Sequence, residues 1–128
     1  MLKQPAASWS FVRDDDHAPP PGSEGRSSYL RWLFFAVTEL APTVLEAMIA
    51  AERRDDAALA TARQSFETHA CLLESALAKA SHLLGEMQTA ADVKVGTILA
   101  WAQSLDLGLV EAHPRLAEYA HRVLEREP

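Results

Sequence analysis

Hydrophobic residues recur at three- and four-residue steps from Arg26 onward, the spacing of one face of an α-helix. In a first segment, from about Glu24 to Glu52, one stripe comprises Leu30, Leu33, Phe34, Val37, Leu40, Ala41, Val44, Leu45 and Met48. A second segment runs from about Asp56 to His82, a third begins at Thr89 and a fourth at Pro114. No segment in this region alternates with period two. The pattern therefore predicts an all-α, four-to-five-helix bundle.

Two features of the first segment bear on its shape and its contacts. Pro42 has no amide to bond the carbonyl of Thr38, so we expect a kink there rather than an end. At about 100° per residue, Trp32, Phe35 and Glu39 fall opposite the apolar stripe, on the face expected to be wet. Two large aromatic side chains there indicate a ligand pocket or a partner surface, unless another helix of this chain covers them.

The third segment begins with the spacing of a capping box, in which Thr89 and Asp92 bond each other's backbone amides. Residues 93–102 are apolar apart from Lys94 and Thr97, so this helix is expected to be the buried central rod. Asp92 has a structural role in this interpretation, because it satisfies free amides at the positive end of the helix dipole. Its loss should lower stability without altering a ligand contact.

Residues 1–25 are expected to be a tail and linker, and residues 26–128 a helical domain. The tail contains an acidic run at residues 14–16 and a Pro-Pro-Pro-Gly breaker at residues 19–22. Trp9, Phe11 and Val12 form an alternating apolar patch that either docks on the helices or stays disordered. We expect only the helical part to form a core.

Charge and cysteine content narrow the functional classes. The 128 residues include 12 Lys and Arg against 18 Asp and Glu, a formal net charge of −6. That balance argues against binding to nucleic acid or to an anionic membrane. The single cysteine suits a reducing compartment. With no secretory signal and no run of roughly 20 apolar residues, a cytoplasmic protein is expected.

Taken together, these segments resemble the C-terminal helical domain of a glutathione S-transferase, and are most similar to bacterial beta-class members. The resemblance rests on the Trp-Leu and Thr-Glu-Leu elements within residues 29–40, on Leu84-Gly85 with the following capping box, and on residues 98–102 with 113–116. It covers residues 19–126. It implies the helical half that shapes an electrophile pocket and part of a dimer contact.

The resemblance also implies what this sequence does not supply. Family enzymes carry an N-terminal thioredoxin-like domain that binds glutathione and activates its thiol, and residues 1–12 have no room for βαβ units. The beta-class histidine that follows Thr-Glu-Leu is Ala41 here. We therefore expect this chain to have no catalytic residue and to bind no cofactor alone. Glutathione is implied only if a thioredoxin-like partner domain provides its site.

A hydrophobic ligand surface is the one candidate site, and its predicted residues are Tyr29, Trp32, Phe35, Glu39 and Trp101. Trp101 has core packing as its alternative. The five histidines lack metal-ligand spacing and Cys71 lacks an activating partner, so neither a metal site nor a reactive thiol is expected.

Three functional hypotheses remain open. The first is a glutathione S-transferase-like protein that is inactive without a thioredoxin-like partner domain. The second is a non-catalytic protein-interaction module, and the third is a truncated gene product. The partners considered are a second copy of the chain, a thioredoxin-like domain and a hydrophobic small molecule.

Overall fold

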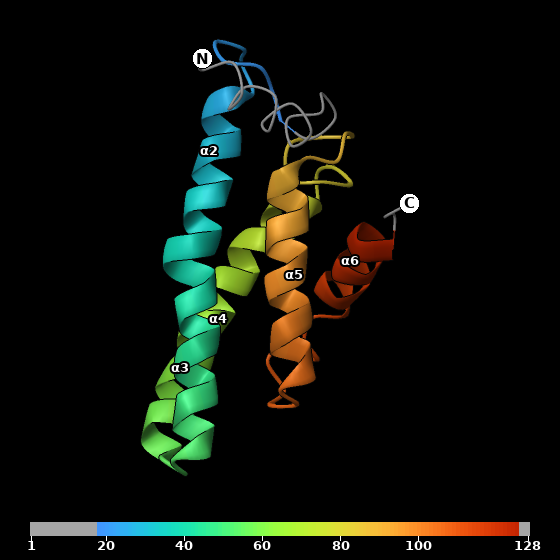
Figure 1. The fold of residues 1–128 in the computed structure, drawn as a ribbon. Coiled ribbons are helices and arrows are strands. Elements are labelled where there is room, and N and C mark those ends of the chain that lie inside the picture. Colours follow the sequence, from blue (N-terminus) through green and yellow to red (C-terminus); the bar gives the residue numbers. More distant parts are fainter. Residues whose placement is uncertain (1–17, 126–128) are drawn as a thin grey trace, which may run out of the picture.

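The computed structural model describes residues 18–125, which fold into helices packed side by side (Figure 1). The element bounds are α2 Arg26–Phe35, the π-helical η2 Ala36–Leu40, α3 Ala41–Glu52, α4 Asp56–Leu77, α5 Ala90–Ser104 and α6 Pro114–Glu125. The elements α2, η2 and α3 form one continuous helix, Arg26–Glu52. The predicted all-α bundle is confirmed for the described part of the chain. The apolar patch at Trp9, Phe11 and Val12 lies outside the described residues.

The helix α5 is the central element, as predicted, and in Figure 1 it lies between the α2–α3 rod and α6. Its buried residues are Ala91, Asp92, Val95, Gly96, Ile98, Leu99 and Ala102. Lys94 and Thr97, the two polar interruptions, are exposed. A helix this apolar is stable only when its neighbours cover most of its circumference.

The first long helix buries a face that coincides only partly with the predicted stripe, of which Leu40 and Val44 are fully buried. Phe34 is 70% exposed and Val37 is 53% exposed, although both belong to the stripe expected in the core. The buried positions are Tyr29, Ala36, Leu40, Thr43, Val44, Ala47 and Ala50. Trp32 and Phe35, expected on the wet face, are half-buried and pack against the core. The predicted stripe is therefore confirmed at Leu40 and Val44 and wrong at Phe34 and Val37.

The small residues explain which face is buried. This helix is apolar around more than half of its circumference, so periodicity alone does not select a side. Ala36 and Ala47 are fully buried, and small side chains let neighbouring backbones approach closely. The core therefore takes the alanine face. One flank is left as an exposed stripe, which we call the apolar stripe: Leu30, Phe34, Val37, Leu45 and Ile49.

The helix continues through Pro42, as expected, but the distortion takes the form of a π-helical segment. The amide of Ala41 donates to the carbonyl of Ala36, five residues back. Thr43 Oγ1 donates to the carbonyl of Glu39 at 2.8 Å. A proline ring crowds the carbonyl four residues earlier, and the wider π turn gives the ring room.

The Arg26–Glu52 helix is also long and apolar enough to cross a membrane, with a mean hydropathy of 1.6. That is more apolar than the sequence expectation allowed. One such helix is weak support for a membrane span, since the core helix of a soluble protein meets the same criterion. Burial accounts for only part of this composition: 33% of the apolar window is buried, Leu40 and Val44 are fully buried, and Phe34 and Val37 are exposed.

The helix α4 begins at Asp56, as predicted, but it ends at Leu77, before the predicted end at His82. The carboxylate of Asp55 accepts the amide of Ala58 at 3.1 Å and so caps the first turn. The buried positions form a single stripe, Ala62, Phe66, Ala70 and Leu73. The chain leaves the helix after Leu77 and makes a tight turn in which His82 and Gly85 exchange backbone hydrogen bonds. Gly85 has a φ of 131°, a value that favours glycine.

Candidate functional site

An aromatic corner on α2 is the centre of the candidate site. The rings of Trp32 and Phe35 meet edge to face, with centroids 5.5 Å apart and planes at 89°. Phe35 makes a second edge-to-face contact, at 5.4 Å and 86°, with His69 of α4. Such contacts stabilise aromatic pairs beyond their buried area. Phe35 is therefore fixed between two rings.

A cavity of about 290 Å³ opens at this corner, lined by Ser28, Arg31, Trp32 and Phe35. These residues follow i, i+3, i+4, i+7 spacing and so share one face of α2. The cavity is near the lower end of the roughly 300–1,000 Å³ common for ligand sites. Within residues 18–125, neither the Ser28 hydroxyl nor the Arg31 guanidinium has a side-chain hydrogen bond or ion pair. The wall thus offers one cation, one hydroxyl and two aromatic rings.

The other predicted ligand residues lie apart from this cavity. Tyr29 is 8% exposed and belongs to the core, with the Arg26 guanidinium 5.7 Å from its ring centroid. Glu39 is exposed one turn beyond Phe35, and its Oε1 lies 4.0 Å from Nε2 of His69. Trp101 is half-buried against the core on α5. The structure thus brings Trp32 and Phe35 together without adding the other three to the cavity wall.

The carboxylate of Asp92 is the centre of the buried polar network. Asp92 is fully buried, and its Oδ2 accepts the amide of Thr89 at 2.9 Å, while the Thr89 hydroxyl accepts the amide of Ala91 at 3.2 Å. Its Oδ1 accepts the amide of Leu83 at 3.0 Å and the hydroxyl of Tyr119 at 2.6 Å. One side chain therefore joins the capping box of α5, the preceding loop and α6.

Tyr119 donates to a buried anion, which changes its acidity. Burial, the negative charge of Asp92 and the hydrogen bond to it raise the pKa of Tyr119 far above its usual value, and Arg122 opposes them weakly. The phenol therefore stays protonated at any physiological pH, as the donor that Asp92 requires. Sequence spacing missed this contact, because Tyr119 lies 27 residues from Asp92.

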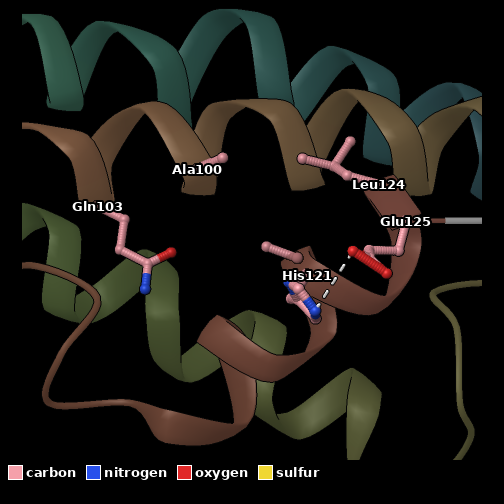
Figure 2. Close-up of a pocket in the computed structure, with 6 residues that line it drawn as sticks. Ala100, Gln103, His121, Leu124 and Glu125 are labelled. Atoms are coloured by element: carbon pink, nitrogen blue, oxygen red, sulfur yellow. Dashed lines mark ion pairs between the residues drawn. The ribbon is translucent and has the colours of Figure 1, made fainter.

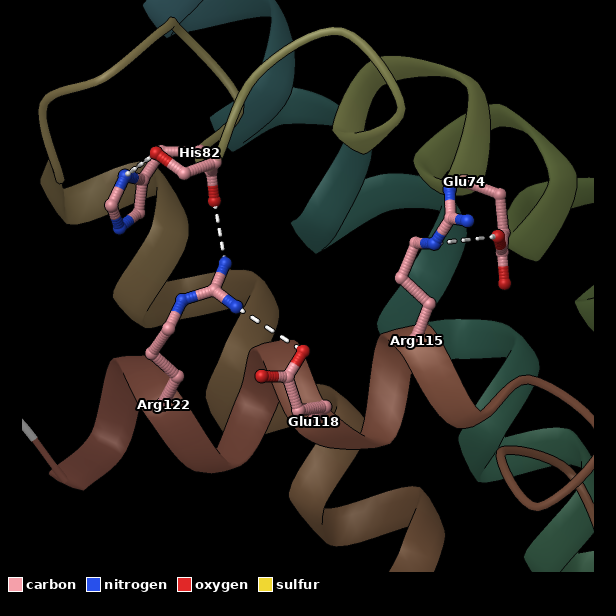
Figure 3. A network of polar contacts seen from close by, with 6 residues as sticks. Glu74, His82, Arg115, Glu118 and Arg122 are labelled. Atoms are coloured by element: carbon pink, nitrogen blue, oxygen red, sulfur yellow. Dashed lines mark hydrogen bonds and ion pairs between the residues drawn. The ribbon is translucent and has the colours of Figure 1, made fainter.

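Polar contacts also fasten the two ends of α6, and Figure 3 shows those of Arg122 near one end and the 3.9 Å ion pair of Arg115 with Glu74 near the other. Near its C-terminal end, Arg122 donates to the carbonyl of Ser81 at 2.6 Å and to Glu118 at 3.4 Å. Just before its N-terminal end, His113 places Nε2 3.0 Å from Glu67 and Nδ1 3.3 Å from Glu74. Both contacts of His113 are hydrogen bonds only when its imidazole carries two protons. These contacts have structural roles.

A second cavity, of about 460 Å³, lies between α5 and α6 (Figure 2). Its lining residues are Ala100, Gln103, Ala120, His121, Leu124 and Glu125. Nε2 of His121 lies 3.7 Å from Oε2 of Glu125, and both side chains are largely exposed. An open, solvated pair of this kind contributes little binding energy.

Cys71 is exposed, and residues 18–125 contain no group of three or more side chains that could hold a metal ion.

Comparison with known proteins identifies the helical architecture. A sequence model described as the glutathione S-transferase C-terminal domain matches residues 56–122, more than half of the 128-residue chain. Among solved structures, the bacterial glutathione S-transferase BphK, in a ternary complex, superposes with a TM-score of 0.79 at 26% identity over 95% of this chain. A glutathione S-transferase from Actinobacillus pleuropneumoniae, at 17% identity and a TM-score of 0.66 over 98% of this chain, shares the fold.

The matches cover nearly all of this chain but a much smaller share of each neighbour's chain. This chain matches 60% of the BphK chain and 56% of the Actinobacillus pleuropneumoniae chain, less than two thirds of either. Comparison with curated protein sequences found no match.

Proposed function

Because the chain belongs to the glutathione S-transferase family through its C-terminal helical domain, we propose that it supplies an apolar ligand surface and a protein contact to a glutathione S-transferase-like assembly. The ligand surface is the aromatic corner of Trp32 and Phe35 with its cavity. Activation of the glutathione thiol belongs, in this proposal, to a thioredoxin-like domain. The assembly is cytoplasmic, where the single cysteine stays reduced.

The packing of the aromatic corner is the main support for the ligand role. Phe35 is held by Trp32 on one side and His69 on the other, so the wall is rigid before a ligand arrives. Preorganised apolar walls reduce the ordering cost of binding. An electrophile with a flat apolar body would contact both rings and displace water from them.

The apolar stripe carries the protein contact. Five large hydrophobic side chains follow one another along α2, η2 and α3, and the most exposed of them, Phe34, is 70% open to solvent. Contiguous apolar patches of this kind mark protein interfaces. We assign the stripe to a second copy of this chain, with a thioredoxin-like domain as the alternative occupant.

A non-catalytic interaction module is the second candidate function, and the same stripe favours it. The two candidates differ in what they require of the aromatic corner. A ligand-binding half needs the corner to take up a small aromatic molecule, whereas a pure interaction module does not.

The test uses the purified 128-residue chain. Its three Trp indole N–H signals are followed by NMR, with Trp32→Phe to assign one of them. Titration with the neutral aromatic 1-naphthalenemethanol should shift the Trp32 signal more than the Trp101 signal. If no aromatic compound shifts Trp32, the ligand role is wrong and the interaction module stands.

The same sample tests whether activation of the glutathione thiol requires another domain. Alone, the chain should pass through a glutathione-affinity column and should not conjugate glutathione to 1-chloro-2,4-dinitrobenzene. Measurable conjugation by the chain alone would overturn the assignment of thiol activation to another domain.

A further inference from the structure

We propose that the cavity on α2 selects planar aromatic anions, such as aromatic carboxylates, over neutral aromatic molecules. This inference rests on the proposed ligand role of the aromatic corner and names the chemical class that the corner takes. Trp32 and Phe35 provide the apolar walls. Arg31 and Ser28, on the same wall, provide a cation and a hydroxyl for an acidic group.

Arg31 and Arg26 differ in whether their guanidinium groups have partners among residues 18–125. Other arginines near this end of the bundle are committed: Arg26 donates to the carbonyl of Pro19 at 3.1 Å and lies over the Tyr29 ring. Arg31 has no such partner among residues 18–125. A guanidinium pairs with a carboxylate through parallel hydrogen bonds. The positive charge of Arg31 at the cavity also disfavours an ammonium ligand, which the aromatic faces would otherwise accept.

The charges along α2 and η2 fix the orientation of the ligand. Glu39 follows Phe35 by one turn, and Arg31 precedes Glu39 by eight residues, about 12 Å along the axis. Ser28 lies in the first turn of a helix that begins at Arg26, where the helix dipole is positive. The acidic group therefore points toward the N-terminal end of α2, and the rings lie toward Phe35, away from the repulsion of Glu39.

The experiment compares two probes of equal size, 1-naphthoate and 1-naphthalenemethanol, by the Trp32 indole N–H signal. Because Arg31 is exposed and its ion pair is screened by water, we expect naphthoate to bind about three- to fivefold more tightly. Arg31→Gln should remove the preference, so that the ratio of the naphthoate affinity to the alcohol affinity falls to about one. Arg53→Gln, an exposed arginine at the far end of the same long helix, is the matched control and should change neither.

The outcomes separate the two proposals. Equal binding of both probes to the wild type, or an unchanged affinity ratio in Arg31→Gln, refutes the selection of anions and leaves the ligand role intact. Failure of both probes to shift Trp32 refutes the ligand role and the anion selection together. Higher salt should weaken naphthoate binding alone, since salt screens an exposed charge pair.

Discussion

At the scale of single residues, Asp92 combines a predicted contact with unpredicted ones. The capping box at Thr89 and Asp92 follows from local spacing, because both partners lie within one helical turn. The contacts of the same carboxylate with Leu83 and Tyr119 depend on how the loop and α6 return to α5. No sequence pattern holds that information. The hydrogen bonds of Asp92 within the capping box were therefore predictable from the sequence, and its bonds to distant residues were not.

Replacing Asp92 with Ala should destabilise the protein by about 2–4 kcal/mol, because it removes a cap and leaves buried donors unpaired. Urea unfolding followed by circular dichroism measures the loss. Asp55→Ala is the matched control: it removes an exposed cap with one hydrogen bond and should cost about 1 kcal/mol. Equal losses for the two variants would show that the buried contacts of Asp92 contribute nothing beyond capping.

Tyr119 should make stability fall at high pH. Its pKa in the folded state is raised far above the usual value, while in the unfolded chain the phenol ionises near pH 10. The stabilising contribution is therefore complete below about pH 10 and is lost as the pH rises further, by up to about 1.4 kcal/mol per pH unit. Tyr119→Phe should be less stable at pH 8 yet lose less stability between pH 10 and 11. Parallel curves for both proteins would contradict this origin.

At the scale of elements, helix existence was predictable and the buried face of one helix was not. The helices α4 and α6 each have a single apolar side, so periodicity predicts their orientation, and α5 is apolar on most sides, so its burial requires no choice of face. The α2–α3 rod has apolar residues on several sides. There, close packing by Ala36 and Ala47 decided the face, and sequence spacing does not report interhelical distance. Four of the five predicted site residues lie on that same rod, and of these only Trp32 and Phe35 line the cavity, while Trp101 lies on α5.

The contact between α5 and α6 leads to a prediction at Gly96. A Cβ there would lie 3.4 Å from Val123 Cγ1, an ordinary contact that leaves no space for more atoms. Gly96→Ala should stabilise the protein by about 0.5–1 kcal/mol through helix propensity. Gly96→Leu should destabilise it by about 1–3 kcal/mol, because the larger side chain forces α6 away. Thermal unfolding of both variants checks the signs, and a stabilising leucine would show that the helices separate freely.

At the scale of the whole molecule, the apolar stripe predicts self-association. Sedimentation equilibrium should detect a dimer in the wild type at tens of micromolar, and Phe34→Glu should remain a monomer because it buries a charge at the interface. Since Phe34 is largely exposed, the variant should keep its unfolding free energy within about 0.5 kcal/mol. Leu72→Glu, at an exposed leucine on α4 that is not part of the stripe, is the control and should still dimerise. A monomeric wild type would refute the second copy as the occupant of the stripe.

The buried carboxylate of Asp92 has a consequence for how the protein is made. Its oxygens accept hydrogen bonds from two backbone amides that precede the central helix, those of Leu83 and Thr89, and one oxygen also accepts the hydroxyl of Tyr119, 27 residues later in the chain. During synthesis on the ribosome, this carboxylate can therefore be buried only with one donor missing until α6 is available. The nascent polypeptide completes its tertiary structure only after α6 has left the exit tunnel, so its early helices depend on the last one.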